Sequence, residues 1–562
     1  MIEDVYEPLD RYKYEFEQKF AELASQKFEE LSEESGVDAN KNRETVSEAR
    51  RLKFKLARAS KKAGALSALI CLLAIAAIAG VWLAATLDVL YIFIAAISLI
   101  LLYPACRSRK ECGGICSDLE LEIKAKISEG YTQMQALNKL YTWDISARLI
   151  EKCVPRLEFD PYFTAARLEE LTRVFDWDGN FNSDKSILFA QSGSINGNPF
   201  ALGEYLRFYW GTKEYTGYKT IYWTAMERDA NGRMRSVRRS QTLRASVLKP
   251  YPEYERKKVL IYGNEAAPNL SFSRRPSGLS TAGDGLSARL KKWWKLRELK
   301  SFSRNLSDDS DYTLMSNHEF ETLFETKNRD NEVEYRLLFT PLAQRQMLKL
   351  LKDDKNGFGD DFTFAKRKKI NLIFADHLDK TPIDTNPQRF KNWNYDEAKT
   401  DFMRFNLSYF RSVYFAFAPL LSIPLYQQTR THEDIYGDIS KARPSFWEHE
   451  SIANYYGDSR FKNPLSATQN ILKTKLLGSD GGMSKVEVTA RGFRGVPRTE
   501  FKSVLGADMR MHSVPIEWVE YLPVENASTI YISESKEAAE AFKENRICEG
   551  ELCRRGIYSF LG

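Results

Sequence analysis

The residues that could carry out chemistry are few, and their spacing fits no catalytic motif. The chain has five histidines, which are His318, His377, His432, His449 and His512. None stands in the His-Glu-x-x-His spacing that places two imidazoles on one helical face for zinc. The glycine motifs of phosphate-binding, dinucleotide-binding and serine-hydrolase loops are also missing from the sequence. We therefore assign no catalytic, cofactor-binding or metal-binding residue and expect no cofactor.

Two polar clusters resemble sites only at first sight. Asp176–Asp184 alternates oxygen-bearing side chains like the start of a calcium loop. Its sixth position is Phe181 instead of glycine and its twelfth is Ile187 instead of glutamate, so we interpret it as a turn before a strand. The Glu-His-Glu cluster at Glu448–Glu450 lacks a second histidine, and a lone histidine is usually structural or exposed.

The cysteines indicate a reducing compartment. There are seven in 562 residues, and they are unevenly spaced. The spacings Cys112-x3-Cys116 and Cys548-x4-Cys553 fit no zinc pattern. A sparse, odd number of cysteines is typical of cytosolic proteins rather than of a disulfide framework.

Two long apolar runs separated by one charge predict a transmembrane helical hairpin. Ala63–Leu87 and Val89–Cys106 contain no charged residue, and Asp88 stands between them. About 20 apolar residues are enough for a helix to cross a bilayer. Basic residues flank both runs on their outer sides, from Arg50–Lys62 and Arg107–Lys110, which predicts that both termini are cytoplasmic. The alternative is a long buried helical hairpin in a soluble protein.

The remaining chain is long enough for several domains and predicts an α+β fold. We expect a cytosolic helical segment at 1–60, the transmembrane hairpin at 61–107, a helical stalk at 108–156, a central α+β domain at 157–385 and a C-terminal α+β domain at 386–562. Antiparallel sheets with packed helices would form the two α+β domains. The charges nearly balance, with 82 basic and 76 acidic residues, so we expect no nucleic-acid partner.

Two Asn-Gly pairs between alternating apolar and polar residues predict β-hairpins. They are Asn196-Gly197 within Ser186–Trp210 and Asn231-Gly232 within Thr220–Pro250. The second hairpin carries Arg233, Arg235, Arg238 and Arg239 at its tip. These arginines could meet phosphate or lipid headgroups, or they could simply be solvated.

Three further segments have specific expectations. Glu334–Asp353 reads as a strand, a turn at Pro341 and a helix. Val413–Tyr426 is short for a membrane span, so we expect a buried core segment, with an interfacial segment as the alternative. Ser533–Cys548 reads as a helix with Ser533 as its N-cap.

Leu286–Phe302 predicts a basic amphipathic helix that could lie at a membrane interface. The residues that would form this interface are Leu290, Lys291, Lys292, Trp293, Trp294 and Lys295. Tryptophan and lysine together suit the headgroup region of an anionic leaflet. The alternative is a charged surface helix whose tryptophans pack on a neighbouring sheet.

The central region resembles the bacterial membrane proteins of domain-of-unknown-function family 3137. The resemblance rests on Glu319-Phe320-Glu321 with Phe324, which match a strand in that family, and on Arg336–Pro341 before a leucine-rich helix. It covers about Leu157–Asp376. It implies a bacterial plasma (inner) membrane protein and no chemistry, because that family has no assigned catalytic residues.

Two functions from different classes remain open. The first is a membrane-anchored scaffold or binding protein on the cytoplasmic face, whose partners are the lipid bilayer, anionic headgroups, and a protein or a second copy of the chain. The second is an enzyme that acts on a membrane-proximal substrate, for which Asp360, Asp361 and Lys366 are the candidate residues. The missing motifs favour the scaffold.

Overall fold

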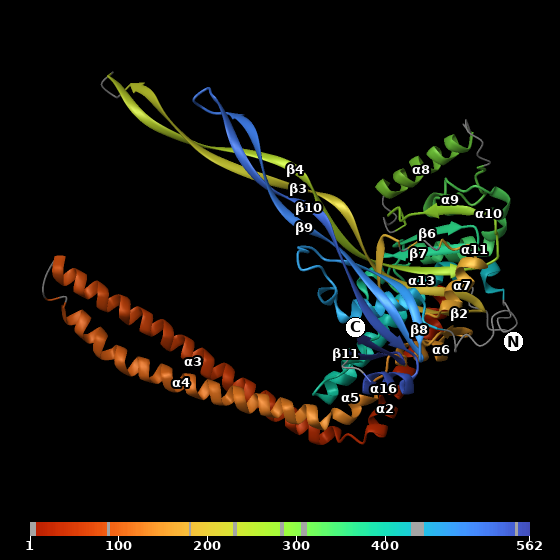
Figure 1. Ribbon diagram of the computed structural model, residues 1–562, viewed down its shortest axis with the longest axis horizontal. Helices are drawn as coiled ribbons and strands as arrows, with labels where there is room; N and C mark the ends of the chain where they lie inside the picture. The colour runs from red at the N-terminus through yellow and green to blue at the C-terminus, as the bar shows by residue number, and fades with distance from the viewer. Residues whose placement is uncertain are drawn as a thin grey trace. The chain divides into compact units, whose positions relative to one another are not determined.

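The computed structural model of the protein is a mixture of helices and antiparallel sheets, which confirms the α+β fold (Figure 1). It describes residues 7–86, 90, 92–178, 181, 183–228, 233–280, 286–304, 312–428, 443–545 and 549–562. The chain divides into two compact units. Unit 1 contains Met1–Phe20, Ser146–Thr385 and Ser408–Gly562, and unit 2 contains Ala21–Ile145 and Asn386–Leu407.

Unit 2 is built on long helices. They are α2 (Glu17–Ser35, whose first residues belong to unit 1), α3 (Ala39–Thr86), α4 (Ile92–Gln133) and α5 (Gln135–Leu140). A short break at residues 36–38 separates α2 from α3. The Asp38 carboxylate accepts from the backbone N–H groups of Asn40 (2.9 Å) and Lys41 (3.1 Å), and so caps α3.

Helices α3 and α4 lie side by side and are long and apolar enough to span a membrane (Figure 1). Small residues face the partner helix and are buried, namely Ala63, Ala77, Ala95, Ser98 and Ala105. Only 11% and 17% of the most apolar windows of α3 and α4 are buried, whereas a core helix of a soluble protein would be mostly buried. The predicted turn residue Asp88 lies outside the described residues.

Polar contacts join the first turns of α3 and the last turns of α4 to each other and to the segment Asn386–Leu407. Asn42 is fully buried, and its side-chain amide donates to the backbone oxygen of Trp393 (3.0 Å) and to Gln133 (3.1 Å). Lys126 forms an ion pair with Glu48 (2.8 Å). A Cβ added at Gly130 would lie 2.8 Å from the Trp393 ring, so glycine allows this close approach.

The larger sheet of unit 1 is antiparallel, with strand order β1-β2-β3-β4-β7-β6-β5. Its strands are β1 (Leu157–Phe159), β2 (Lys185–Ile195), β3 (Asn198–Arg228), β4 (Met234–Gly263), β5 (Ser271–Arg274), β6 (Phe362–Arg367) and β7 (Ile370–Ala375). Asn196 (φ 52°) and Gly197 (φ 75°) form the predicted hairpin turn between β2 and β3. The second predicted turn, Asn231-Gly232, lies outside the described residues.

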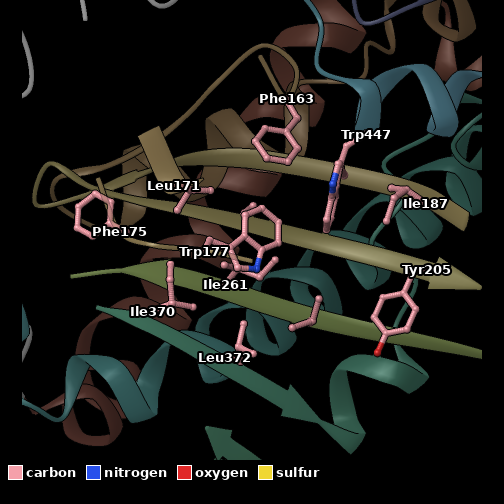
Figure 2. Packing of buried hydrophobic residues seen from close by; sticks show 13 residues of the cluster. Phe163, Leu171, Phe175, Trp177, Ile187, Tyr205, Ile261, Ile370, Leu372 and Trp447 are labelled. Carbon is pink, nitrogen blue, oxygen red and sulfur yellow. The ribbon is translucent and has the colours of Figure 1, made fainter. Parts of the chain in front are cut away.

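One face of this sheet carries a core of aromatic side chains (Figure 2). Trp177 and Trp447 lie with ring centroids 5.3 Å apart, and Trp447 covers Gly203 of β3. A Cβ at position 203 would lie 2.8 Å from the Trp447 ring, so the indole can approach the sheet this closely only because glycine stands there. Helices α7 (Ala165–Arg173) and α15 (Phe446–Tyr456) cover this face, and α6 (Ile145–Cys153) precedes β1.

Short helices border the rest of the larger sheet. They are α8 (Leu286–Arg304), α9 (His318–Phe324), α10 (Glu332–Leu338), α11 (Pro341–Lys352) and α12 (Asp376–Lys380). The strand predicted at the start of Glu334–Asp353 is wrong, because Asn331 caps a helix by accepting from the Glu334 N–H (3.0 Å). Asn317 caps α9 in the same way, so the strand that the family resemblance implies at Glu319–Phe324 is also a helix.

Helix α13 (Tyr395–Leu421) ends in the apolar segment whose burial the sequence predicts. The side chains of Val413 and of Phe415–Ala418 are buried, which confirms a core segment. The N-terminal helices α1 (Pro8–Arg11) and η1 (Tyr12–Phe16) and the start of α2 pack on it. The rings of Phe20 and Phe410 stack 4.2 Å apart.

The smaller sheet of unit 1 has the order β11-β12-β10-β9-β8. Its strands are β8 (Ile471–Asp480), β9 (Met483–Leu505), β10 (Met511–Ser533), β11 (Glu549–Arg554) and β12 (Ile557–Leu561). Helix α16 (Lys536–Asn545) follows β10. The predicted N-cap Ser533 is wrong, because its hydroxyl donates to the Gly482 carbonyl (2.8 Å), and Ser535 instead accepts from the Ala538 N–H (3.2 Å).

The distal parts of two long hairpins, β3–β4 and β9–β10, pack on each other and form what we call the arm (residues 210–228, 233–250 and 494–522). Figure 1 shows the two ribbons side by side, extending beyond the body of the unit. The buried residues between them are Ile221, Leu243, Ala245, Val247, Val514 and Ile516. From Trp210 to Arg228, an extended strand covers about 60 Å.

Candidate functional site

The Glu-His-Glu cluster of α15 is a buried junction between the two sheets of unit 1. Glu450 accepts from the Ile187 N–H of β2 (3.1 Å) and forms an ion pair with Lys473 of β8 (2.6 Å). Glu448 forms an ion pair with Arg555 (3.2 Å) beside β12. Both glutamates are fully buried, so no substrate can reach them. The cluster holds the sheets together and is not an active site.

Burial shifts the ionisation of this cluster strongly. It raises the pKa of Glu450 to about 7, although Lys473 and the backbone donors act in the opposite direction. It lowers the pKa of His449 to about 4, because burial disfavours the charged form of the imidazole. The Nδ1 atom of His449 is buried without a hydrogen-bond partner. Groups with shifted pKa values often mark active sites, but a substrate cannot reach these two buried side chains.

The structure does not bring together Asp360, Asp361 and Lys366, the candidate residues of the enzyme hypothesis. Asp360 and Asp361 precede β6, whereas Lys366 lies near its other end, about 17 Å away along an extended strand. Asp360 forms a fully buried ion pair with Arg274. The Lys366 ammonium donates to the backbone oxygens of Ala266 (3.0 Å) and Lys368 (2.6 Å).

Lys366 is buried, as reactive lysines often are, but in the described part of the chain no path leads from the surface to its ammonium group. Its side chain is fully buried, and burial lowers its pKa to about 7. A nucleophilic lysine also needs a path for its substrate. The Tyr426 ring, 5.7 Å away, and the two carbonyl acceptors surround its ammonium group, so Lys366 is a structural residue.

Asp361 and His377 form a pair that the sequence analysis did not find. The Nδ1 atom of His377 lies 2.6 Å from the Asp361 carboxylate, and its Nε2 atom lies 3.1 Å from the backbone oxygen of Ser412. The Ser412 hydroxyl instead shares a hydrogen bond with Thr381 (2.6 Å), so this is no catalytic triad. The adjoining cavity, of about 10 Å³, has room for one water molecule.

The described part of the chain shows neither a metal site nor an activated thiol. There, no group of three His, Cys, Asp or Glu side chains could hold a metal ion. The cysteines that the structure describes as free thiols are Cys71, Cys106, Cys112, Cys116, Cys153 and Cys553. Burial raises the pKa of Cys153 to about 12, which makes this thiol inert.

Helix α8 exposes the tryptophans that the sequence places at a membrane interface. Trp293 and Trp294 are 52% and 59% exposed, and Leu290 is exposed one turn earlier. The Arg297 guanidinium lies over both indoles, 5.5 and 5.8 Å from their centroids. Lys291 is exposed and Lys292 half-buried. Lys295 forms an ion pair with Glu325 (2.8 Å), so it fixes the helix instead of facing solvent. The tryptophans do not pack on the sheet.

The arm carries an aromatic groove between its two ribbons. Trp210 and Pro250 of the first hairpin and Trp518, Glu520 and Tyr521 of the second line an open cavity of about 390 Å³. The groove mixes flat aromatic faces with charged pairs at its rim. Such surfaces are typical of protein recognition sites, because aromatic side chains bury much area at a low cost in entropy.

Ion pairs and ring contacts fix the lining of this groove. Arg498 forms an ion pair with Glu520 (2.7 Å), and Lys249 lies 4.5 Å from the centroid of the Trp518 ring. The Trp210 ring meets Phe493 edge to face, at 5.0 Å. Side chains held in this way are preorganised for binding, which lowers the entropy lost when a partner docks.

No protein-family model, curated protein or solved structure matches this chain. Its function must therefore be argued from its own surfaces. The sequence indicated the exposed α8 face through its tryptophan and lysine spacing. It did not indicate the groove, because Trp210 and Trp518 are brought together only by the packing of two hairpins distant in sequence.

Proposed function

We propose that this protein is a membrane-anchored scaffold or binding protein without an evident catalytic site, and that the arm is its binding surface. The observation that carries this proposal is the groove of Trp210, Trp518 and Tyr521, preorganised between two stacked hairpins. The groups at Glu448–Glu450, Arg274, Asp360 and Lys366 are instead buried in the protein interior. A partner protein or a second copy of this chain is the class of ligand that an open aromatic surface fits.

The anchor is the pair of apolar helices α3 and α4. In this proposal they form a two-helix hairpin in the plasma (inner) membrane of a bacterium, with both chain termini in the cytoplasm. The support is the basic residues at the outer ends of the apolar runs, among them Arg58, Lys61, Lys62 and Arg109. The exposed face of α8 adds a candidate site for contact with anionic headgroups.

Affinity capture from the native membrane tests the function. The full-length tagged chain is extracted in mild detergent beside two variants, one with Trp210→Ala and Tyr521→Ala in the groove and one with Val333→Ala. Val333 is 79% exposed and lies outside the arm, so the second variant is a control for the loss of exposed apolar area. A partner that co-purifies in fixed stoichiometry with the wild type and the control, but not with the groove variant, supports the proposal.

A partner that is retained by the groove variant would place the binding surface elsewhere. Recovery of all three chains without a partner and as monomers would contradict the scaffold function.

A further inference from the structure

The outer part of the β3–β4 hairpin has an excess of positive charge. Residues 219–244 contain seven basic and two acidic residues, a net charge of +5. Arg228, Arg233, Arg235, Arg238 and Arg239 of this segment are all exposed. Concentrated charge of this kind creates a strong local potential that attracts anionic partners.

The end of this hairpin protrudes beyond its neighbour in the arm. The turn of the second hairpin stops against the first, where the Ala507 N–H donates to the Gln241 side chain (2.7 Å). A Cβ at Gly506 would lie 2.6 Å from Ile221. The first hairpin continues from there to Arg228 and Met234, which are paired in register. We call residues 222–228 and 233–240 the tip.

The tip combines arginine with large apolar side chains on its outer face. Strand periodicity places Tyr222, Met226, Met234 and Arg238 on the face opposite the arm core. Met226 and Met234 are 61% and 58% exposed. The Arg238 guanidinium lies 4.8 Å from the centroid of the Tyr222 ring, a cation–π contact that holds the two side chains on this face.

We propose that this tip docks on an anionic phospholipid bilayer. Its arginines would meet lipid phosphates, and Met226 and Met234 would enter the boundary between headgroups and acyl chains. The proposal rests on the membrane anchoring in the proposed function, because a chain that is already held at a membrane keeps the tip near lipid. It adds a second contact with lipid to the anchor.

The apolar side chains favour a bilayer over a nucleic acid. Phosphate contacts alone would be the same for both, and Tyr222 could stack on a base. Methionine side chains have no ring that could stack on a base. In a bilayer, by contrast, burial of each exposed methionine side chain is favourable. Each arginine near an anionic surface strengthens binding by about fivefold. The attraction should also weaken as salt rises, because the Debye length shortens.

The full-length chain in nanodiscs of phosphatidylcholine allows a direct test. Immobilised nanodiscs are mixed with vesicles of phosphatidylcholine alone or of equal parts phosphatidylcholine and phosphatidylglycerol, and vesicle capture is measured. In parallel, amide hydrogen exchange at the tip is compared between neutral nanodiscs and nanodiscs that contain phosphatidylglycerol. We expect capture or tip protection only with the anionic lipid.

Two variants identify the residues responsible. One changes Arg228, Arg233, Arg235, Arg238 and Arg239 to Gln, and the other changes Met226 and Met234 to Ser. We expect the first to lower the response at least about tenfold and the second to lower it severalfold. The matched control removes the same charge from exposed positions elsewhere in unit 1, with Arg345, Lys380, Arg460, Lys462 and Lys475 changed to Gln.

Several results would overturn the proposal. They are the lack of any response to anionic lipid in both measurements, an equal loss in the charge control, and a full response in the methionine variant. Tight RNA or DNA binding that the arginine variant loses, with vesicle capture unchanged, would identify a nucleic-acid site instead. Failure of the membrane anchor itself is distinguishable, because the chain would then not enter nanodiscs at all.

Discussion

Gly217 of β3 lies directly against the backbone carbonyl of Pro515 in β10, where the two hairpins of the arm pack on each other. A Cβ at position 217 would be 2.0 Å from that oxygen and 2.9 Å from the Ile516 side chain. The carbonyl belongs to a paired strand, so it cannot move aside without loss of the ladder. The stacking of the arm therefore depends on glycine at this position.

Gly217→Ala should separate the two hairpins. We expect faster amide exchange in both distal ribbons and a partial exposure of Val514 and Ile516, with a loss of about 2 kcal/mol because the backbone must shift. Gly478→Ala is the matched control, since no atom lies within 4 Å of a Cβ there. Equal exchange in both variants would show that the hairpins are not stacked in solution.

The pKa of Glu450 predicts a stability that falls as pH rises. Burial raises this pKa from 4.5 to about 7, so between these values the folded state keeps a proton that the unfolded state has lost. Stability is then lost as the pH increases through this range. Glu450→Gln cannot ionise, and relative to the wild type it should gain about 3 kcal/mol in the free energy of unfolding between about pH 4 and about pH 8. Urea unfolding at several pH values measures the difference, and parallel curves would contradict it.

The pKa of His449 predicts the opposite dependence of stability on pH, over an overlapping pH range. Burial lowers its pKa from 6.5 to about 4, so between these values the unfolded state binds a proton that the folded state refuses. Its contribution is complete above the unfolded pKa and is lost as the pH falls. His449→Phe should remove about 3 kcal/mol of acid destabilisation between about pH 7 and about pH 4. A variant with unchanged acid sensitivity would mean that the imidazole is charged in the fold.

Local chemistry made some elements predictable. The turn at Asn196-Gly197 needs positive φ at two successive residues, and few residue pairs other than Asn-Gly accept this. The apolar helices follow from their length and composition. Helix α10 was mistaken for a strand because its apolar spacing suits both, although Asn331 followed by Glu334 is a capping signal that could have decided it.

Long-range pairing was not predictable from one sequence. Glu450 meets Lys473 only because α15 lies where β2 and β8 approach each other. Asp361 meets His377 through the pairing of β6 with β7, and Trp210 meets Trp518 through the packing of two hairpins that are distant in the sequence; no local pattern encodes either contact.

The exposed face of α8 predicts a loss of lipid contact without a loss of stability. Trp293→Ala with Trp294→Ala should reduce the binding of the nanodisc-held chain to vesicles rich in phosphatidylglycerol several-fold. The unfolding free energy should change by less than about 1 kcal/mol, because both indoles are more than half exposed. Leu299→Ala is the contrasting variant, since this side chain is fully buried and its loss should destabilise the helix. Unchanged binding in the tryptophan variant would remove α8 as an interface helix.

The buried ion pair of Arg274 and Asp360 predicts that Asp360 stabilises the fold. Both side chains are buried, and Asp360 also accepts from the Ser277 N–H (2.9 Å). Arg274→Ala should cost about 3–5 kcal/mol, because it leaves a carboxylate buried without its counter-charge. Arg274→Met combined with Asp360→Leu should recover most of that loss, since neither charge then needs desolvation. Denaturant unfolding of the single and double variants gives the coupling energy. A double variant as unstable as the single one would mean that the other contacts of Arg274 and Asp360, with Phe362 and Ser277, set the cost instead of the unpaired charge.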